Sequence, residues 1–213
     1  MKNNGLIMQY FENNLPCDHT LWAKLKGDAN KLKTMGVTAV WCPPAYKGAD
    51  GVEDNGYKVY DSYDLGEFNQ KGSVPTKYGT KEEYLEAIKA LHDKNIQVYA
   101  DVVVNRRYGA DAVEYISGKV FNENSRNQMV GEEKVICGHT KFTFPGRKTK
   151  YSKKKYNWMD FTGIDWNPEL EINDEKSDYV MSNELDFDNM EVVEEIEKWG
   201  EWYLKVTGVD GFR

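Results

Sequence analysis

Cysteine, histidine and long apolar runs are what this sequence lacks most clearly. Its 213 residues include 3 cysteines and 3 histidines. The cysteines stand far apart, at Cys17, Cys42 and Cys137, and an odd number without a C-x-x-C pair argues against a disulfide framework and a zinc site. No segment approaches the ~20 apolar residues of a membrane span, and the first residues lack the apolar core of a signal peptide. We therefore expect a reduced, cytoplasmic protein with no membrane partner.

An excess of positive charge is also missing. The formal net charge is −7, whereas surfaces that bind nucleic acid phosphates usually carry the opposite balance. We therefore expect no nucleic acid partner. The hydrophobic share of 40% and the charged share of 30% are those of an ordinary globular domain. Aromatic residues reach 13%, and such rings either fill a core or pack against the C–H faces of sugars.

Apolar periodicity divides the first half of the chain into alternating strands and helices. Short apolar runs at 6–11 and 37–42 predict buried strands, and apolar residues three and four apart predict a helix over 22–35. A second helix is expected over 80–94, where Thr80 and Glu83 form a capping box. The near-continuous apolar run 96–104 is typical of a strand buried on both faces. This order predicts parallel βαβ units.

The pattern breaks after residue 105 and returns near residue 190. A structureless connection of that length is implausible in a compact domain, so we interpret 106–183 as an inserted lobe. Its cationic run, 147–155, is interpreted as a solvated loop, with polyanion binding as the alternative. Apolar spacing then predicts a helix over 192–206, and 209–213 begins another strand.

The fold class that follows is α/β. We predict an incomplete (β/α)8 TIM barrel, made of three strand–helix units and the start of strand four, rather than a doubly wound sheet. The expected domains are residues 1–105 (barrel, first part), 106–183 (inserted domain) and 184–213 (barrel, continuation). Because the last residues still have the pattern of a strand, we expect the chain to be the front part of a longer protein.

Polar residues near the strand ends are the candidates for chemistry, because the carboxyl ends of barrel strands carry the site. Tyrosines and aspartates between 55 and 66 suit sugar binding, or equally a packed polar loop. Asp101 and Asn105 lie at the end of the third strand. Four carboxylates crowd at the far side of the lobe, at Asp178, Glu184, Asp186 and Asp188, and such oxygen donors suit either calcium or a solvated acidic face.

Several segments resemble the α-amylase family, glycoside hydrolase family 13, of the liquefying bacterial type. The signature segments are D101-VVV-N105, E184-LDF-D188 and G211-F-R213. Segments 6–12, 38–48, 63–68 and 72–80 agree with that type at the right separations. The resemblance therefore covers almost the whole chain and implies a (β/α)8 barrel with a protruding domain B after strand three.

The activity that the resemblance implies is retaining endo-hydrolysis of α-1,4-glucosidic bonds in starch, glycogen and maltooligosaccharides. Retention needs two carboxyl groups about 5–5.5 Å apart, a nucleophile and an acid/base. In the family the nucleophile lies two positions after the residue matched by Arg213, the last residue here, and the acid/base lies further on. We therefore expect the 213 residues alone to be inactive and the activity to belong to a longer, monomeric parent.

The resemblance also assigns roles to residues that are present. Tyr57 matches the tyrosine that stacks against the sugar beside the scissile bond, and Arg213 matches the arginine that holds the nucleophile. Calcium is the implied cofactor. Its positions are matched by Asn105, Asp178 and Glu184, with Asp186 matching a carboxylate that serves a further metal in some relatives. Since Thr162 stands where those relatives carry a carboxylate, one calcium is expected at most.

Arg106 departs from the family pattern, which has a sugar-binding histidine at this position. An arginine is longer and permanently charged, so it either reaches the same hydroxyl or clashes with the substrate. This leaves two further hypotheses beside an active α-amylase. One is a non-catalytic α-glucan-binding remnant, and the other is a related α-glucan hydrolase or transglycosylase.

Overall fold

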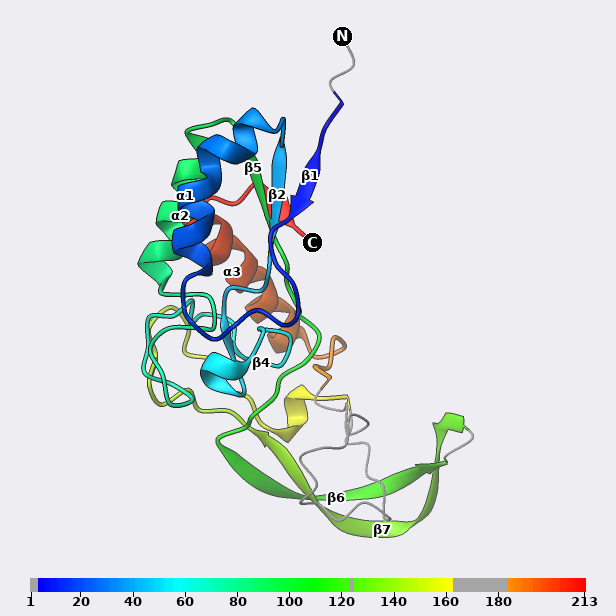
Figure 1. Cartoon of the computed structure of the whole chain (residues 1–213). Coiled ribbons are helices and arrows are strands. Elements are labelled where there is room, and N and C mark those ends of the chain that lie inside the picture. Colours follow the sequence, from blue (N-terminus) through cyan, green and yellow to red (C-terminus); the bar gives the residue numbers. More distant parts are fainter. Residues whose placement is uncertain (1–3, 123–124, 163–183) are drawn as a thin grey trace.

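A four-stranded parallel sheet organises the protein (Figure 1). The structure, a computed structural model, describes residues 4–122, 125–162 and 184–213. The sheet contains β1 (Ile7–Gln9), β2 (Ala39–Cys42), β5 (Gln97–Ala100) and β8 (Gly211–Phe212), which lie side by side in chain order. Each neighbouring pair is parallel. The α/β class and the parallel strand order are therefore as predicted.

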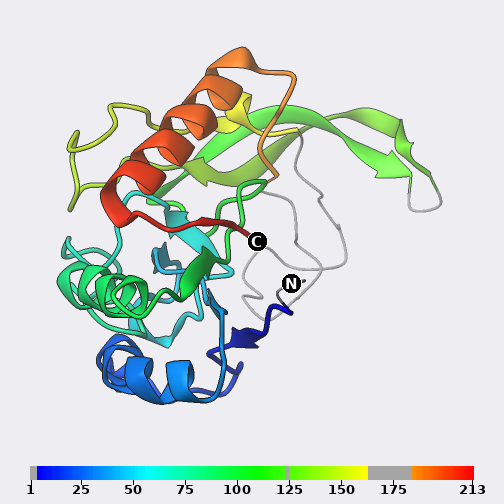
Figure 2. The same ribbon diagram turned by 90° about the horizontal axis from the view of Figure 1, so that it is seen from above.

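Three helices connect these strands and lie together on one side of the sheet (Figures 1 and 2). They are α1 (Leu21–Thr34), α2 (Lys81–His92) and α3 (Met190–Thr207). The expected capping box is present, because the Thr80 side chain accepts from the Glu83 N–H and the Glu83 carboxylate accepts from the Thr80 N–H. Gly208 ends α3 in the left-handed conformation at φ 70°. None of the helices in the described ranges is long and apolar enough to cross a membrane.

Two strand predictions need correction. The run 6–11 was expected to be buried, but Ile7 is 62% exposed, because β1 pairs with β2 on one side only. The run 96–104 was expected to be one strand, but β5 ends at Ala100. Beyond that point the Val103 N–H donates to the Tyr46 hydroxyl at 2.6 Å, so a side chain takes the place of a ladder partner.

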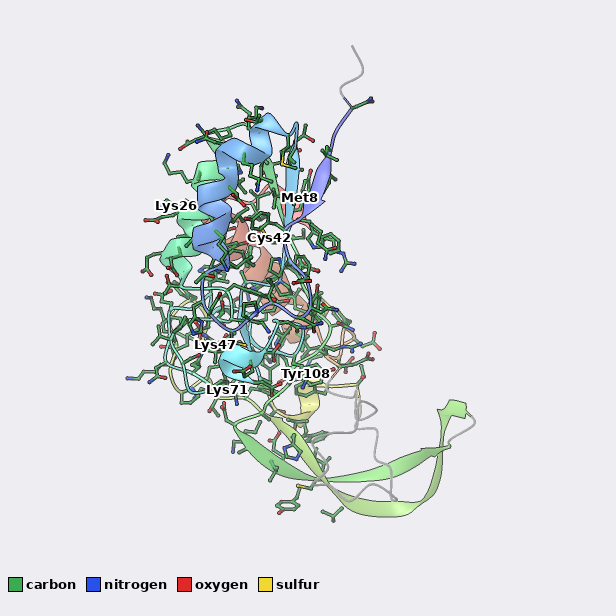
Figure 3. The ribbon with its side chains drawn as sticks, viewed as in Figure 1. Met8, Lys26, Cys42, Lys47, Lys71 and Tyr108 are labelled. Atoms are coloured by element: carbon green, nitrogen blue, oxygen red, sulfur yellow. The ribbon has the colours of Figure 1, made fainter. Side chains whose placement is uncertain are left out.

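A small antiparallel sheet lies beyond the carboxyl ends of the strands of the parallel sheet. Strands β3 (Lys47–Gly48) and β4 (Val59–Asp61) pair there, with the 3-10 helix η1 (Gly51–Glu53) between them. Lys47 lies within this loop region (Figure 3) and is fully buried. Its ammonium donates to the backbone oxygens of Ser73 and Val74 at 2.7 and 2.8 Å, so it holds the loop before α2 in place.

The segment after β5 forms a protruding hairpin rather than a plain loop (Figures 1 and 2). Its strands are β6 (Ala112–Asn122) and β7 (Ser125–Lys141), followed by the 3-10 helix η2 (Trp158–Asp160). A separate apolar cluster anchors the base of this segment, and its buried members are Tyr60, Phe142, Phe144, Tyr156, Phe161, Leu185 and Val192.

The cationic run 147–155 is only partly the solvated loop that was expected. Arg147 is 3% exposed, and its Nε donates to Asp61 Oδ2 at 2.7 Å. Lys150 pairs with Glu67, and Lys154 pairs with Asp160 at 2.7 Å. Lys148, Lys153 and Lys155 are exposed, as a solvated loop requires. The prediction therefore holds for these lysines, whereas the three ion pairs attach the segment to the rest of the protein.

Candidate active site

Asp101 is the point at which residues from three strand ends meet. It follows β5, is 1% exposed, and accepts the Tyr57 hydroxyl at 2.6 Å. Its Oδ2 also accepts from Trp41 Nε1 at 3.2 Å. Arg213 Nη1 lies 3.3 Å from both carboxylate oxygens. The buried carboxylate is thus satisfied by a hydroxyl, an indole and a guanidinium.

Parallel pairing accounts for this convergence. The Asp101 N–H donates to the Cys42 oxygen of β2, and the Arg213 N–H donates to the Ala100 oxygen of β5. The carboxyl ends of β2, β5 and β8 are therefore level with one another, so Trp41, Asp101 and Arg213 lie at the same edge of the sheet. Sequence reasoning placed functional residues at this edge, and the structure brings Tyr57 and Arg213 together there.

Arg213 combines a fixed position with access to solvent. Its side chain is 60% exposed, and its guanidinium carbon lies 4.4 Å from the centre of the Trp41 ring. The ring supports one face of the cation, and Asp101 orients its Nη1. Trp41 was missed by the sequence analysis, which treated it as an apolar strand residue. Its place at the end of β2, beside the expected site, was the available signal.

Tyr57 is a hydrogen-bond donor held by a rigid loop. Burial and the hydrogen bond to Asp101 raise the pKa of Tyr57 well above its usual range, so the hydroxyl stays protonated at neutral pH. Gly56 before it has φ 87°, and a Cβ at Gly56 would lie 2.7 Å from Pro44. The Gly56 N–H donates to Asp54 Oδ1 at 2.8 Å. This turn therefore requires glycine and fixes the direction in which Tyr57 leaves the backbone.

The residues predicted to bind calcium come from two segments, one after β5 and one before α3. Asn105, Glu184 and Asp186 line one open hollow, together with Thr162. The Leu185 N–H donates to the Asn105 oxygen at 2.8 Å, which brings the two segments together. Asp178, the remaining predicted ligand, lies outside the described residues.

The donors in this hollow are amide and carboxylate oxygens, the type that calcium prefers. Among the residues that the structure describes, no three His, Cys, Asp or Glu side chains gather closely enough to hold a metal ion. The described residues therefore supply oxygen donors of the right kind for calcium, but they do not by themselves form a complete set of ligands.

Arg106 contacts Glu184, one of the residues that line this hollow. Its Nη2 is 3.4 Å from Glu184 Oε1, and its Nη1 is 3.4 Å from the Tyr108 hydroxyl. A backbone bridge between Arg106 and Glu184 sets the two side chains beside each other. The ion pair between the predicted sugar-binding residue and a predicted calcium ligand was not foreseen from the sequence.

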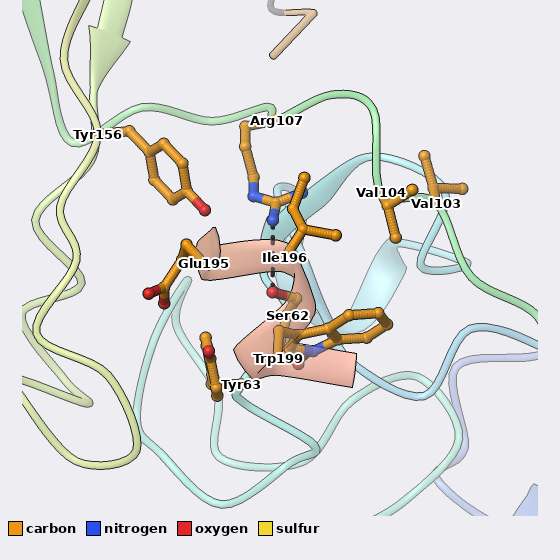
Figure 4. Close-up of a pocket in the computed structure, with 9 residues that line it drawn as sticks. All are labelled: Ser62, Tyr63, Val103, Val104, Arg107, Tyr156, Glu195, Ile196 and Trp199. Carbon is orange, nitrogen blue, oxygen red and sulfur yellow. Dashed lines mark hydrogen bonds between the residues drawn. The ribbon is translucent and has the colours of Figure 1, made fainter. Parts of the chain in front are cut away.

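A small enclosed cavity lies between α3 and the segments around Ser62 and Tyr156 (Figure 4). Arg107 points into it and donates to the Ser62 hydroxyl at 3.4 Å. The cavity measures about 10 Å³, which is room for one water molecule and not for a sugar. It is a packing feature between the lobe and the sheet domain.

Comparison with known proteins decides the family. The model described as the α-amylase catalytic domain matches residues 16–213. The chain belongs to the α-amylase family. It is 47% identical to an α-amylase from Geobacillus stearothermophilus, over 99% of this chain and 42% of that protein. It is 45% identical to a glucan 1,4-alpha-maltohexaosidase from Bacillus sp. (strain 707), covering 44% of it.

Two further α-amylase comparisons concern a cytoplasmic relative and the fold. The chain is 40% identical to the cytoplasmic α-amylase of Escherichia coli (strain K12), over 99% of this chain and 47% of that protein. It thus spans less than half the length of these curated relatives. A crystal structure of a noncanonic maltogenic α-amylase from Thermotoga neapolitana superposes with a TM-score of 0.53 at 20% identity, over 97% of this chain and 38% of that one. This likeness supports an α-amylase fold.

Proposed function

We propose that this chain forms the front part of the substrate cleft of an α-amylase. The reaction is retaining endo-hydrolysis of α-1,4-glucosidic bonds in starch, glycogen and maltooligosaccharides. The observation that carries the proposal is the meeting of Tyr57, Trp41 and Arg213 at the buried Asp101 carboxylate. Membership of the α-amylase family supports it.

In this proposal the residues of the chain bind and orient, while the two reacting carboxyl groups come from outside the 213 residues. The Tyr57 ring packs against the sugar beside the scissile bond. The exposed part of the Arg213 guanidinium holds the nucleophile, and Asp101 and Trp41 fix the direction of that guanidinium. Nucleophile and acid/base stand about 5–5.5 Å apart in a retaining glycosidase.

Arg106 is the second proposed sugar contact. A guanidinium has five N–H donors, and two of the Arg106 nitrogens lie 3.4 Å from the Glu184 carboxylate and from the Tyr108 hydroxyl. In this proposal the guanidinium donates to a sugar hydroxyl in the cleavage subsite.

We further propose that the sheet is the first part of a (β/α)8 barrel, with domains at 1–105, 106–183 and 184–213. The hairpin and the apolar cluster at its base support the assignment of 106–183 as domain B. Asn105, Asp178, Glu184 and Asp186 are the proposed calcium ligands. When bound, the ion would supply positive charge between carboxylates of domain B and of the barrel. A cytoplasmic location is proposed, in line with the name of the Escherichia coli relative, and the whole protein is proposed to be a monomer.

The test is hydrolysis of a blocked maltoheptaoside by the product of the whole reading frame that contains these residues. Internal cleavage that releases products of retained α configuration, followed by NMR, is the expected result. Binding of maltooligosaccharide without cleavage would instead support the alternative of a non-catalytic glucan-binding remnant. Transfer of glucosyl units in place of hydrolysis would point to a transglycosylase.

A further inference from the structure

The turn that carries Tyr57 is closed by one buried carboxylate. Asp54 follows η1 directly and is 6% exposed. Its Oδ1 accepts the Gly56 N–H at 2.8 Å and the Lys58 N–H at 3.4 Å, and these two groups belong to the residues on either side of Tyr57. A single oxygen atom therefore holds the backbone both before and after Tyr57.

The position of this carboxylate is itself fixed by β3. Its Oδ2 accepts the Asp50 N–H at 3.3 Å. A Cβ at Gly48 would lie 2.2 Å from Asp54 Cγ, so only glycine allows β3 and the Asp54 side chain to approach each other this closely. Because β3 packs directly against it, the carboxylate has no room to move away from the turn.

The Tyr57 side chain is held at its two ends. Its hydroxyl donates to the Asp101 carboxylate at 2.6 Å, and its backbone lies in the turn that Asp54 closes. The Tyr57 N–H also donates to Asn55 Oδ1 at 3.3 Å. The residue between these attachments stays partly exposed. A ring that is ordered before a ligand arrives loses less conformational entropy when the ligand binds.

We propose that Asp54 is a positioning residue, which sets the orientation of the Tyr57 ring that contacts the sugar. The inference rests on the proposed function, in which this ring packs against the sugar beside the scissile bond. The Asp54 carboxylate is buried and accepts backbone N–H groups, so it acts through Tyr57 and not by contact with the substrate. A small displacement of a group that positions the substrate is enough to lower the rate.

A double-mutant cycle tests this role, because residues that act as one unit have non-additive effects. The values of kcat/KM for a blocked maltoheptaoside are compared among the parent, Asp54→Ala, Tyr57→Ala and the double variant, in the product of the whole reading frame. Affinity for maltoheptaose, measured by calorimetry, gives the same cycle for binding. Circular dichroism confirms that each variant folds. Asp54→Glu, which keeps the charge and displaces the oxygens, replaces Asp54→Ala if the latter does not fold.

Two further variants separate positioning from a general loss of stability. Asp54→Asn keeps an oxygen that accepts the Gly56 and Lys58 N–H groups, so it should retain most of the activity. Asp111→Ala removes a carboxylate that likewise accepts backbone N–H groups, those of Thr143 and Phe144, but in the lobe.

The inference predicts a fall of about five- to tenfold in kcat/KM for Asp54→Ala when Tyr57 is present. In the Tyr57→Ala background the same change should lower kcat/KM by less than about twofold. Asp54→Asn should stay within about threefold of the parent, and Asp111→Ala within about twofold.

Two results would overturn the positioning role and leave Tyr57 as a sugar contact. One is an equal fall for Asp54→Ala with and without the Tyr57 side chain, and the other is an unchanged kcat/KM in Asp54→Ala. An unchanged kcat/KM in Tyr57→Ala would instead overturn the proposed function, and the inference with it. A parent that neither cleaves nor binds the oligosaccharide would do the same.

Discussion

Asp101 shows how one buried charge organises a site. The carboxylate is 1% exposed, and burial of a charge is costly unless hydrogen bonds and an opposite charge satisfy it. Tyr57, Trp41 and Arg213 do so from three different segments of the chain. The same contacts orient the Tyr57 and Arg213 side chains. The hydrogen bonds that stabilise the buried carboxylate therefore also position the two side chains that are proposed to contact the sugar and the nucleophile.

Asp101→Asn tests this arrangement through the free energy of unfolding. The amide loses the ion pair with Arg213 and turns an N–H group toward donors, so we expect a loss of about 1–3 kcal/mol. The measurement is urea denaturation of the chain at pH 7. Asp93→Asn is the matched control, because Asp93 pairs with Lys89 at the surface and its loss should destabilise the chain less than the loss of Asp101. Equal effects of the two variants would contradict the account.

Glu67 gives a prediction about pH. Burial alone would raise its pKa, but hydrogen bonds from Lys150, Lys81 and Tyr151 outweigh this effect and lower the pKa to about 2. The carboxyl of the unfolded chain has a pKa of 4.5. The ionised carboxylate therefore stabilises the folded state above pH 4.5, and this contribution is lost as the pH falls toward 2.

Glu67→Gln should therefore lower the free energy of unfolding by about 2 kcal/mol at pH 7 and by progressively less below pH 4.5. Chemical denaturation of parent and variant over that pH range measures the difference. Glu86→Gln serves as the control, since Glu86 pairs with Lys26 on the surface. A difference between parent and Glu67→Gln that is constant with pH would contradict the lowered pKa.

At the residue scale, the resemblance predicted Tyr57 and Arg213 as site residues. Both contact the Asp101 carboxylate, in agreement with the expectation that functional residues gather at the carboxyl ends of the strands. Two features were not predictable in this way. The contact between the Trp41 ring and the Arg213 guanidinium depends on the face of the sheet to which Trp41 points, and apolar periodicity alone does not give that face. The ion pair of Arg106 with Glu184 joins residues 78 positions apart, through a bridge that no local pattern marks.

At the scale of elements, Arg147 ties the segment after the hairpin to the loop after β4. Its Nε donates to Asp61, and its Nη1 donates to the backbone oxygens of Lys150 and Ser152, both at 2.8 Å. The pair with Asp61 is 1% exposed on both sides. A buried pair of this kind matters most when one partner is removed, because the other charge is then left uncompensated.

Arg147→Met should destabilise the chain by about 3–5 kcal/mol, because Asp61 stays buried without its cation. Lys148→Met is the control one residue away, and its exposed side chain should change stability by less than about 0.5 kcal/mol. Thermal and urea unfolding of both variants compare them directly. If Arg147→Met were as mild as Lys148→Met, the segment would be the solvated loop that composition suggested.

The helices were predictable because their signals are local. Apolar spacing and the Thr80 capping box place α2, and Gly208 marks the end of α3. The hairpin β6–β7 was not predicted, because most residues of β7 are polar and the antiparallel pairing lies within a lobe where the apolar pattern breaks. The end of β5 was also missed, since a contact between Tyr46 and Val103 decides it.

At the scale of the whole molecule, a parallel sheet sets the polar ends of its strands at one edge, and the lobe packs against that same edge. The strand order β1-β2-β5-β8 follows from alternating strands and helices, so it was predictable from the sequence. The packing of the lobe depends on Arg147, Lys154 and an aromatic cluster, and this required the structure. The central claim is that this shared edge is the sugar-binding part of an α-amylase cleft.

The most direct test compares kcat/KM for a blocked maltoheptaoside between Tyr57→Ala and Tyr115→Ala, in the product of the whole reading frame. Tyr115 lies on the hairpin and is 76% exposed, so it controls for loss of a tyrosine. The account predicts a fall of at least about tenfold for Tyr57→Ala, which corresponds to roughly 1.4 kcal/mol of transition-state stabilisation. Tyr115→Ala should stay within about twofold of the parent. An unchanged kcat/KM in Tyr57→Ala would contradict the claim that substrate binds at this edge.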